Sequence, residues 1–160
     1  MYKRQLHARQ EGHELQCAEA HERLGDASLQ NEQPERAPGS TPAARDLLCT
    51  LREGGTLPPH DRRLADVEFY LGVTNLQLGA LDEAKAHYRQ AAATLRLRRA
   101  TLLRASLDEQ IAGLEQAVAA GGGAAADADT NADAEVREIS ELVAEIEGRI
   151  EELVGHVGGV

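Results

Sequence analysis

Aromatic residues are scarce in this chain of 160 residues. It has no Trp, one Phe and three Tyr, so aromatics make up 2% of the composition. β-Sandwiches and barrels draw on aromatic and β-branched side chains, so this scarcity argues against an all-β fold. The length suits one domain with a modest core. We therefore expect a single domain built from helices.

Basic residues are also few. Lys and Arg total 17 against 27 Asp and Glu, which gives a formal net charge of -10. Such a chain is a poor candidate for direct binding to nucleic acid, whose phosphates require cationic partners. An acidic surface suits a basic protein partner.

Cysteines and long apolar runs are too few to indicate a disulfide scaffold or a membrane span. Cys17 and Cys49 do not make a disulfide framework. The first residues lack the apolar stretch of a signal peptide, and the small-residue run at 117–126 is too short to cross a bilayer. We expect a soluble intracellular protein with no membrane contact. The histidines show no metal-ligand spacing with the cysteines, and no catalytic constellation is visible, so we expect neither metal, cofactor nor enzymatic activity.

Apolar residues spaced by three and four predict helices over about 13–31, 43–53, 61–78, 81–120 and 134–154. The prolines between residues 32 and 44 are expected to break the helix and so to separate the first two helices. The chain then divides into a tail or upstream-helix remnant at 1–12, helical repeats at 13–120, a Gly/Ala/Asp linker at 121–133, a capping helix at 134–154 and a tail at 155–160.

Two apolar rows near the C-terminus resemble the seams of a coiled coil. One contains Leu103, Leu107, Ile111, Leu114 and Val118. The other runs from Val136 to Leu153. We expect the two rows to pack together as an antiparallel hairpin.

The sequence contains an internal repeat at an offset of 47 residues. The segment 17–30 aligns with 64–77, and the register continues from Ala37 to Ala84. Matching small-residue positions and the spacing in the second copy are typical of tetratricopeptide repeats. The repeat positions are Leu24, Gly25 and Ala37 in the first copy, and Leu71, Gly72, Ala84, Tyr88 and Ala91 in the second. Small residues allow close approach of paired helices, and Tyr88 is expected to fill the gap to the next hairpin.

The run from Leu57 to Gly72, with Leu81-Asp82-Glu83-Ala84, resembles the interrupted tetratricopeptide repeats of the nuclear autoantigenic sperm protein family. Residues 20–29 resemble the preceding repeat helix of that family, and residues 135–153 resemble its C-terminal capping helix. Members of the family are histone chaperones. The resemblance implies binding of histone H3–H4, an H3 variant or linker histone, support of nucleosome assembly, and a nuclear location that the cytoplasm can share.

The sequence departs from that family in three respects. It has no long acidic tract, it has no basic stretch after the capping helix, and Pro38 and Pro42 follow the first Leu-Gly helix. The first departure puts a contribution to histone affinity in doubt, and the second puts autonomous nuclear import in doubt. The expected helix near residue 13 also has no cap before it, so the native chain is expected either to extend upstream or to be a reduced one.

Counting from the two Leu-Gly pairs assigns one set of side chains to the concave face. These are Glu19, Glu22, Asp26 and Leu29 in the first copy, and Asp66, Phe69, Val73, Leu76 and Gln77 in the second. Apolar anchors among carboxylates suit a basic amphipathic helix. The alternative is a helical adaptor without histone specificity that forms a homodimer through the seams at 103–118 and 136–153.

Overall fold

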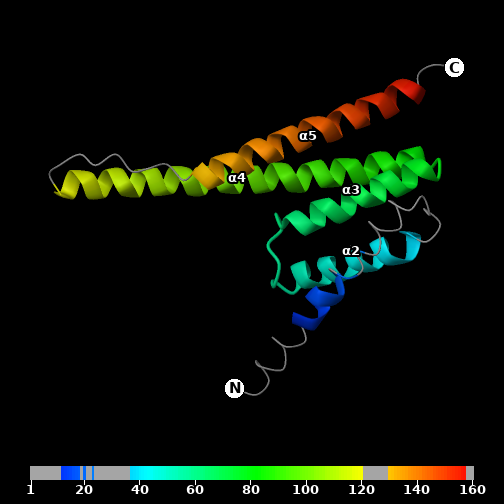
Figure 1. The fold of residues 1–160 in the computed structure, drawn as a ribbon, viewed down its shortest axis with the longest axis horizontal. Coiled ribbons are helices and arrows are strands. Elements are labelled where there is room, and N and C mark those ends of the chain that lie inside the picture. Colours follow the sequence, from blue (N-terminus) through cyan, green and yellow to red (C-terminus); the bar gives the residue numbers. More distant parts are fainter. Residues whose placement is uncertain (1–11, 19, 21–22, 24–36, 121–129, 158–160) are drawn as a thin grey trace.

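The computed structural model describes all residues except 1–11, 19, 21–22, 24–36, 121–129 and 158–160. Among the described residues every regular element is a helix, so the expected all-α class is confirmed. In Figure 1, α3 and α5 lie along one half of the much longer α4, and α2 packs on α3. No helix in the described part of the chain combines the length and apolar character needed to cross a membrane.

α2 spans Ala37–Glu53 and begins earlier than the predicted residue 43. The expected proline break up to residue 44 was wrong, because Pro42 lies inside this helix. A proline removes one backbone hydrogen bond, here near the start of the helix. Its neighbours Thr41 and Ala44 are both buried. Burial of Thr41 and Ala44 therefore offsets the loss of that hydrogen bond.

α3 spans Arg62–Gln77 and begins at the cap that the sequence predicted. The Asp61 carboxylate accepts a hydrogen bond from the backbone N–H of Arg63 at 3.0 Å. Hydrogen bonding from the Arg63 side chain lowers the pKa of Asp61. A buried apolar face of α3 packs against α2. The cluster between the two helices contains Leu48, Leu51, Leu64, Val67 and Leu71.

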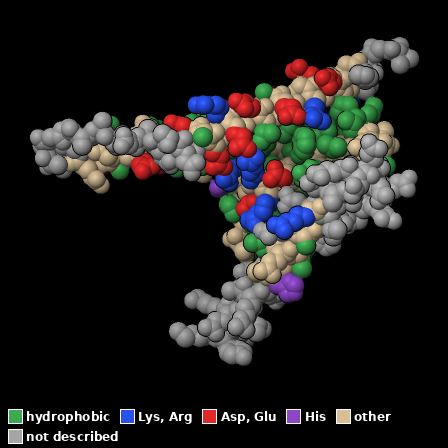
Figure 2. Space-filling view, viewed as in Figure 1, with side chains coloured by type: hydrophobic (Ala, Val, Ile, Leu, Met, Phe, Trp, Pro, Cys, Tyr) green, Lys and Arg blue, Asp and Glu red, His purple; other side chains and the backbone are tan. Residues whose placement is uncertain are grey.

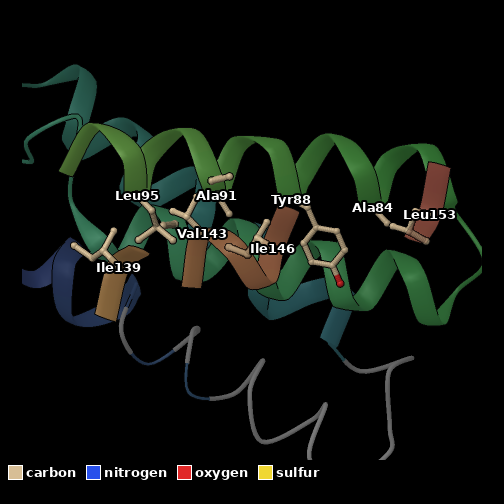
Figure 3. Packing of buried hydrophobic residues seen from close by; sticks show 10 residues of the cluster. Ala84, Tyr88, Ala91, Leu95, Ile139, Val143, Ile146 and Leu153 are labelled. Atoms are coloured by element: carbon tan, nitrogen blue, oxygen red, sulfur yellow. The ribbon is translucent and has the colours of Figure 1, made fainter. Parts of the chain in front are cut away.

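α3 and α4 form a tight hairpin. The chain turns at Gly79, whose φ of 77° favours glycine, and enters α4 (Leu81–Ala120). Gly72 lies against Tyr88, because a Cβ atom at this position would be 2.6 Å from the Tyr88 ring. Figure 3 shows Tyr88 between Ala84 and Ala91 along α4, and all three side chains are fully buried. The close packing of α3 on α4 therefore requires glycine at position 72.

α5 spans Thr130–Val157, so it starts before and ends after the predicted 134–154. Asp133 in its first turn favours the helix start, where carboxylates interact well with the helix dipole. α5 runs antiparallel to α4 and in the same direction as α3 (Figure 1). The main core lies between these helices, where Ile139, Val143, Ile146 and Leu153 of α5 are buried.

The apolar row of α5 does not pack on the predicted seam at 103–118. It packs on the first half of α4, against small and apolar residues between Ala84 and Leu95 (Figure 3). α3 and this half of α4 together offer a two-helix surface lined with alanines, into which large aliphatic side chains fit. The seam offers one helix only. Leu103, Leu107, Ile111 and Leu114 are instead 46–67% exposed, and the Val118 side chain lies outside the described residues.

Candidate partner-binding surface

One row of α3 faces the side of the hairpin on which α5 lies. Phe69, Val73 and Leu76 pack against the core cluster that α4 and α5 share. Asp66 precedes them in the same row and lies 3.9 Å from Arg62, which also binds Glu138 of α5. The structure therefore brings these four predicted residues together.

The prediction that this row of α3 forms an open concave face needs one correction. Phe69 and Val73 are partly buried in the core rather than freely presented, because α5 supplies the apolar partner for their row. Gln77 is exposed at the end of α3. The part of the row that still borders an open groove is the end at Leu76.

This groove lies between α3 and α5 and has a volume of about 360 Å³. Figure 2 shows hydrophobic side chains gathered between α5 and α3, with charged side chains beside them. The lining residues are Leu76, Ala144, Glu145, Gly148, Arg149, Glu152 and Leu153. A Cβ atom added to Gly148 would meet nothing within 4 Å, so the groove is open at that point.

Arg149 is one of the residues that line the groove. Its guanidinium lies 5.3 Å from the centre of the Phe69 ring and donates a hydrogen bond of 2.9 Å to Glu145. The hydrogen bond with Glu145 raises the pKa of Arg149. The arginine is therefore paired within α5, and the acidic residues in the lining of the groove are Glu145 and Glu152.

The Tyr88 hydroxyl is buried and has no hydrogen-bond partner among the described residues. Burial raises the pKa of this phenol, and the nearby Arg149 opposes that change. The ring packs tilted against Phe69, with centroids 5.6 Å apart. Tyr88 of α4 thus contacts the same Phe69 ring on which the Arg149 guanidinium lies.

Ion pairs close the opposite end of this face. Arg62 donates to Glu138 at 2.6 Å, and this hydrogen bond lowers the pKa of Glu138. Arg98 of α4 pairs with Glu135 of α5 at 2.5 Å. Burial raises the pKa of Asp66, and the Arg62 charge opposes it. The first turns of α5 are thereby tied to α3 and α4.

A buried carboxylate on the other side of α3 escaped the sequence analysis. Glu68 is 5% exposed and accepts from Arg45 Nε of α2 at 2.7 Å. His87 Nδ1 of α4 lies 2.7 Å from the second oxygen of Glu68. One acidic side chain therefore links three helices. The signal was its place between Leu64 and Leu71 on an apolar face, where an acidic residue needs a partner.

The first-copy residues of the predicted groove and repeat lie outside the described residues. They are Glu19, Glu22, Asp26, Leu29, Leu24 and Gly25. Ala37 begins α2, but its side chain is also outside the described set. Whether these residues face the second copy stays a prediction.

Comparison with protein-family models, with curated proteins and with solved structures finds no match for this chain. Among the described residues, no group of three or more His, Cys, Asp or Glu side chains could hold a metal ion. The two cysteines are free, and Cys17 Sγ lies 3.5 Å from His13 Nδ1.

Proposed function

We propose that this protein binds a basic amphipathic helix of a partner protein in the groove between α3 and α5. The observation that supports this is the composition of the groove, whose lining combines the apolar Leu76, Ala144 and Leu153 with the acidic Glu145 and Glu152. Arg149 also lines the groove and is paired with Glu145. Apolar anchors fix the register of a bound helix, and carboxylates meet its Lys or Arg side chains. The net charge of -10 attracts such a partner over longer distances.

The size of the groove fits a short helical contact. Its lining runs along α5 from Ala144 to Leu153, which is about 14 Å at the rise of an α-helix. A partner helix of two to three turns covers this length. The open space at Gly148 admits one large side chain of the partner.

We further propose that the partner is histone H3–H4 or an H3 variant, that linker histone is a secondary candidate, and that binding supports nucleosome assembly in the nucleus without catalysis. The basis for this choice is the resemblance to the nuclear autoantigenic sperm protein family. The packing is compatible with a tetratricopeptide-like stack, since α5 runs parallel to α3 as the first helix of a next hairpin would.

Filling the groove tests the proposal directly. Gly148→Leu places a branched side chain in the open space and should weaken binding of purified H3–H4 by about tenfold or more at physiological salt, as measured by calorimetry. Gly148→Ala is the matched control, because it removes the same glycine with little added bulk. If Gly148→Leu binds H3–H4 as tightly as the native chain, the groove is not the binding site.

Charge at the groove edge gives a second test. Glu152→Lys should reduce H3–H4 binding and its salt dependence, whereas Glu83→Lys on the exposed side of α4 makes the same change in net charge away from the groove. Equal losses in both variants would mean that the acidic protein attracts histones without a specific site. Circular dichroism checks that both variants keep their helices.

The alternative function is a helical adaptor that accepts basic amphipathic helices without histone specificity. A designed Lys/Leu helix of unrelated sequence distinguishes the two functions. It should compete poorly with H3–H4 if the protein is a histone chaperone, and as well as an H3 helix if it is a general adaptor.

A further inference from the structure

The second half of α4 carries an apolar row that is exposed. Among the described side chains of α4, Leu102 is the last that packs against the core cluster. Beyond it, Leu103, Leu107, Ile111 and Leu114 are 50%, 56%, 46% and 67% exposed. In Figure 1 this part of α4 extends past the packed helices. We name these four residues the tip row.

We propose that the tip row is a self-association surface, on which the same segment of a second copy of this chain packs in the antiparallel direction. The four residues follow one another at spacings of four, four and three, so they lie on one side of the helix. The row has apolar residues at both ends. Reversing a second copy therefore places Leu103 near Leu114, and Leu107 near Ile111, on both sides of the two-fold axis.

The charges beside the tip row select the direction. Arg104, Asp108 and Glu115 all lie on the same flank of the row. In an antiparallel pair the two-fold axis is perpendicular to the helices, so like flanks face each other. Arg104 of each copy then lies near Glu115 of the other, which gives two symmetric ion pairs, and the two Asp108 side chains meet near the axis in one like-charge contact.

In a parallel pair each charged flank would face the other flank, which carries the uncharged Ser106 and Gln110. No complementary charge is then available. The exposed Arg104 lies 3.9 Å from Asp108 of its own helix. Two opposite-charge pairs against one like-charge contact thus favour a second, reversed copy of the same helix.

The size of the surface sets the expected strength. Residues 103–114 span about 17 Å of helix. Four partly exposed aliphatic side chains bury a few hundred Å² at most, which is less than the roughly 800 Å² per partner of a standard interface. We expect a reversible dimer with a dissociation constant above about 1 μM. This inference does not depend on histone binding.

Sedimentation velocity of the full chain, from low to high micromolar concentration, tests for this dimer. The native chain should show a concentration-dependent shift from monomer to dimer. Leu107→Asp should raise the dissociation constant by at least about tenfold. Ala105→Asp is the control, because it adds the same charge on the opposite, exposed side of the same helix. A monomer at all concentrations, or a dimer that Leu107→Asp leaves intact, would overturn the proposal.

Charge exchange tests the direction of pairing. Arg104→Glu alone and Glu115→Arg alone should each weaken the dimer, and the double variant should restore it. The restored dimer is specific to the antiparallel arrangement, since Arg104 and Glu115 do not face each other in a parallel pair. A double variant that is as weak as the two single variants would reject the antiparallel geometry. Helicity by circular dichroism confirms that the exposed substitutions leave the fold intact.

Discussion

The two halves of α4 belong to one continuous helix, yet they differ in what they meet. The first half is lined by alanines and packs between α3 and α5, where Ala84, Ala91 and Leu95 are buried. The second half carries the more regular apolar row, and that row is exposed. Regular apolar spacing therefore identifies a helix face that is suited to burial. The size of the side chains decides which of the two faces of α4 is buried within the chain.

The largest expected effect compares one leucine from each half. Leu95 is 3% exposed and Leu107 is 56% exposed. Leu95→Ala should lower the free energy of unfolding by about 3 kcal/mol, because it leaves a cavity in the core. Leu107→Ala should change it by less than about 0.5 kcal/mol in dilute solution. Urea unfolding followed by circular dichroism measures both, and equal losses would mean that the second half is also buried.

A smaller effect compares Gly72 of α3, which packs against the first half of α4, with Gly148 of α5, which lines the groove. Gly72→Ala should lower the free energy of unfolding by about 1–3 kcal/mol, since its Cβ would lie 2.6 Å from the Tyr88 ring. Gly148→Ala should raise it by about 0.5–1 kcal/mol, since the position is helical and open. Thermal and urea unfolding should give opposite signs. A neutral Gly72→Ala would show that the hairpin does not depend on close approach.

The smallest effect concerns Asp66, which lies on α3 beside Arg62. Burial raises its pKa above the value of 3.8 in an unfolded chain. The folded state then holds a proton more tightly, so stability falls as the pH rises through this range. Asp66→Asn should be the more stable protein at neutral pH, by less than about 1 kcal/mol because the side chain is 39% exposed.

The pH dependence provides the control for this last variant. Below pH 3.8 the carboxyl of Asp66 is protonated in both states, and the difference from Asp66→Asn should disappear. Unfolding curves at neutral and acidic pH measure the change. A difference that is constant with pH would mean that Asn alters packing rather than removing a buried charge.

Local signals predicted the helices well. The Asp61 cap, the Gly79 turn and the extent of α4 followed from residue chemistry that acts within one turn of the chain. Pro42 was misread because a proline signal is also local, whereas burial of the adjacent face depends on α3. The all-α class was therefore accessible from the sequence, and the start of α2 was not.

The candidate site was predicted only in part, since it depends on a long-range contact. The spacing placed Asp66, Phe69, Val73 and Leu76 on one face, and the structure places them there. The position of α5 beside that face could not be read from periodicity, because its stripe matches the tip row as well as the alanine-lined half of α4. The partners of Glu68 come from two other helices and were equally inaccessible.

The length of α4 has a consequence for how many ligands one molecule can hold at once. The groove lies near the start of α4, and Leu107 lies about 35 Å further along the same unbroken helix, measured from Ala84. Ligands at these two places would not touch each other. Association of two copies through the tip row would raise the effective concentration of one groove near the other. The avidity for a multivalent partner would then increase without any new contact to that partner.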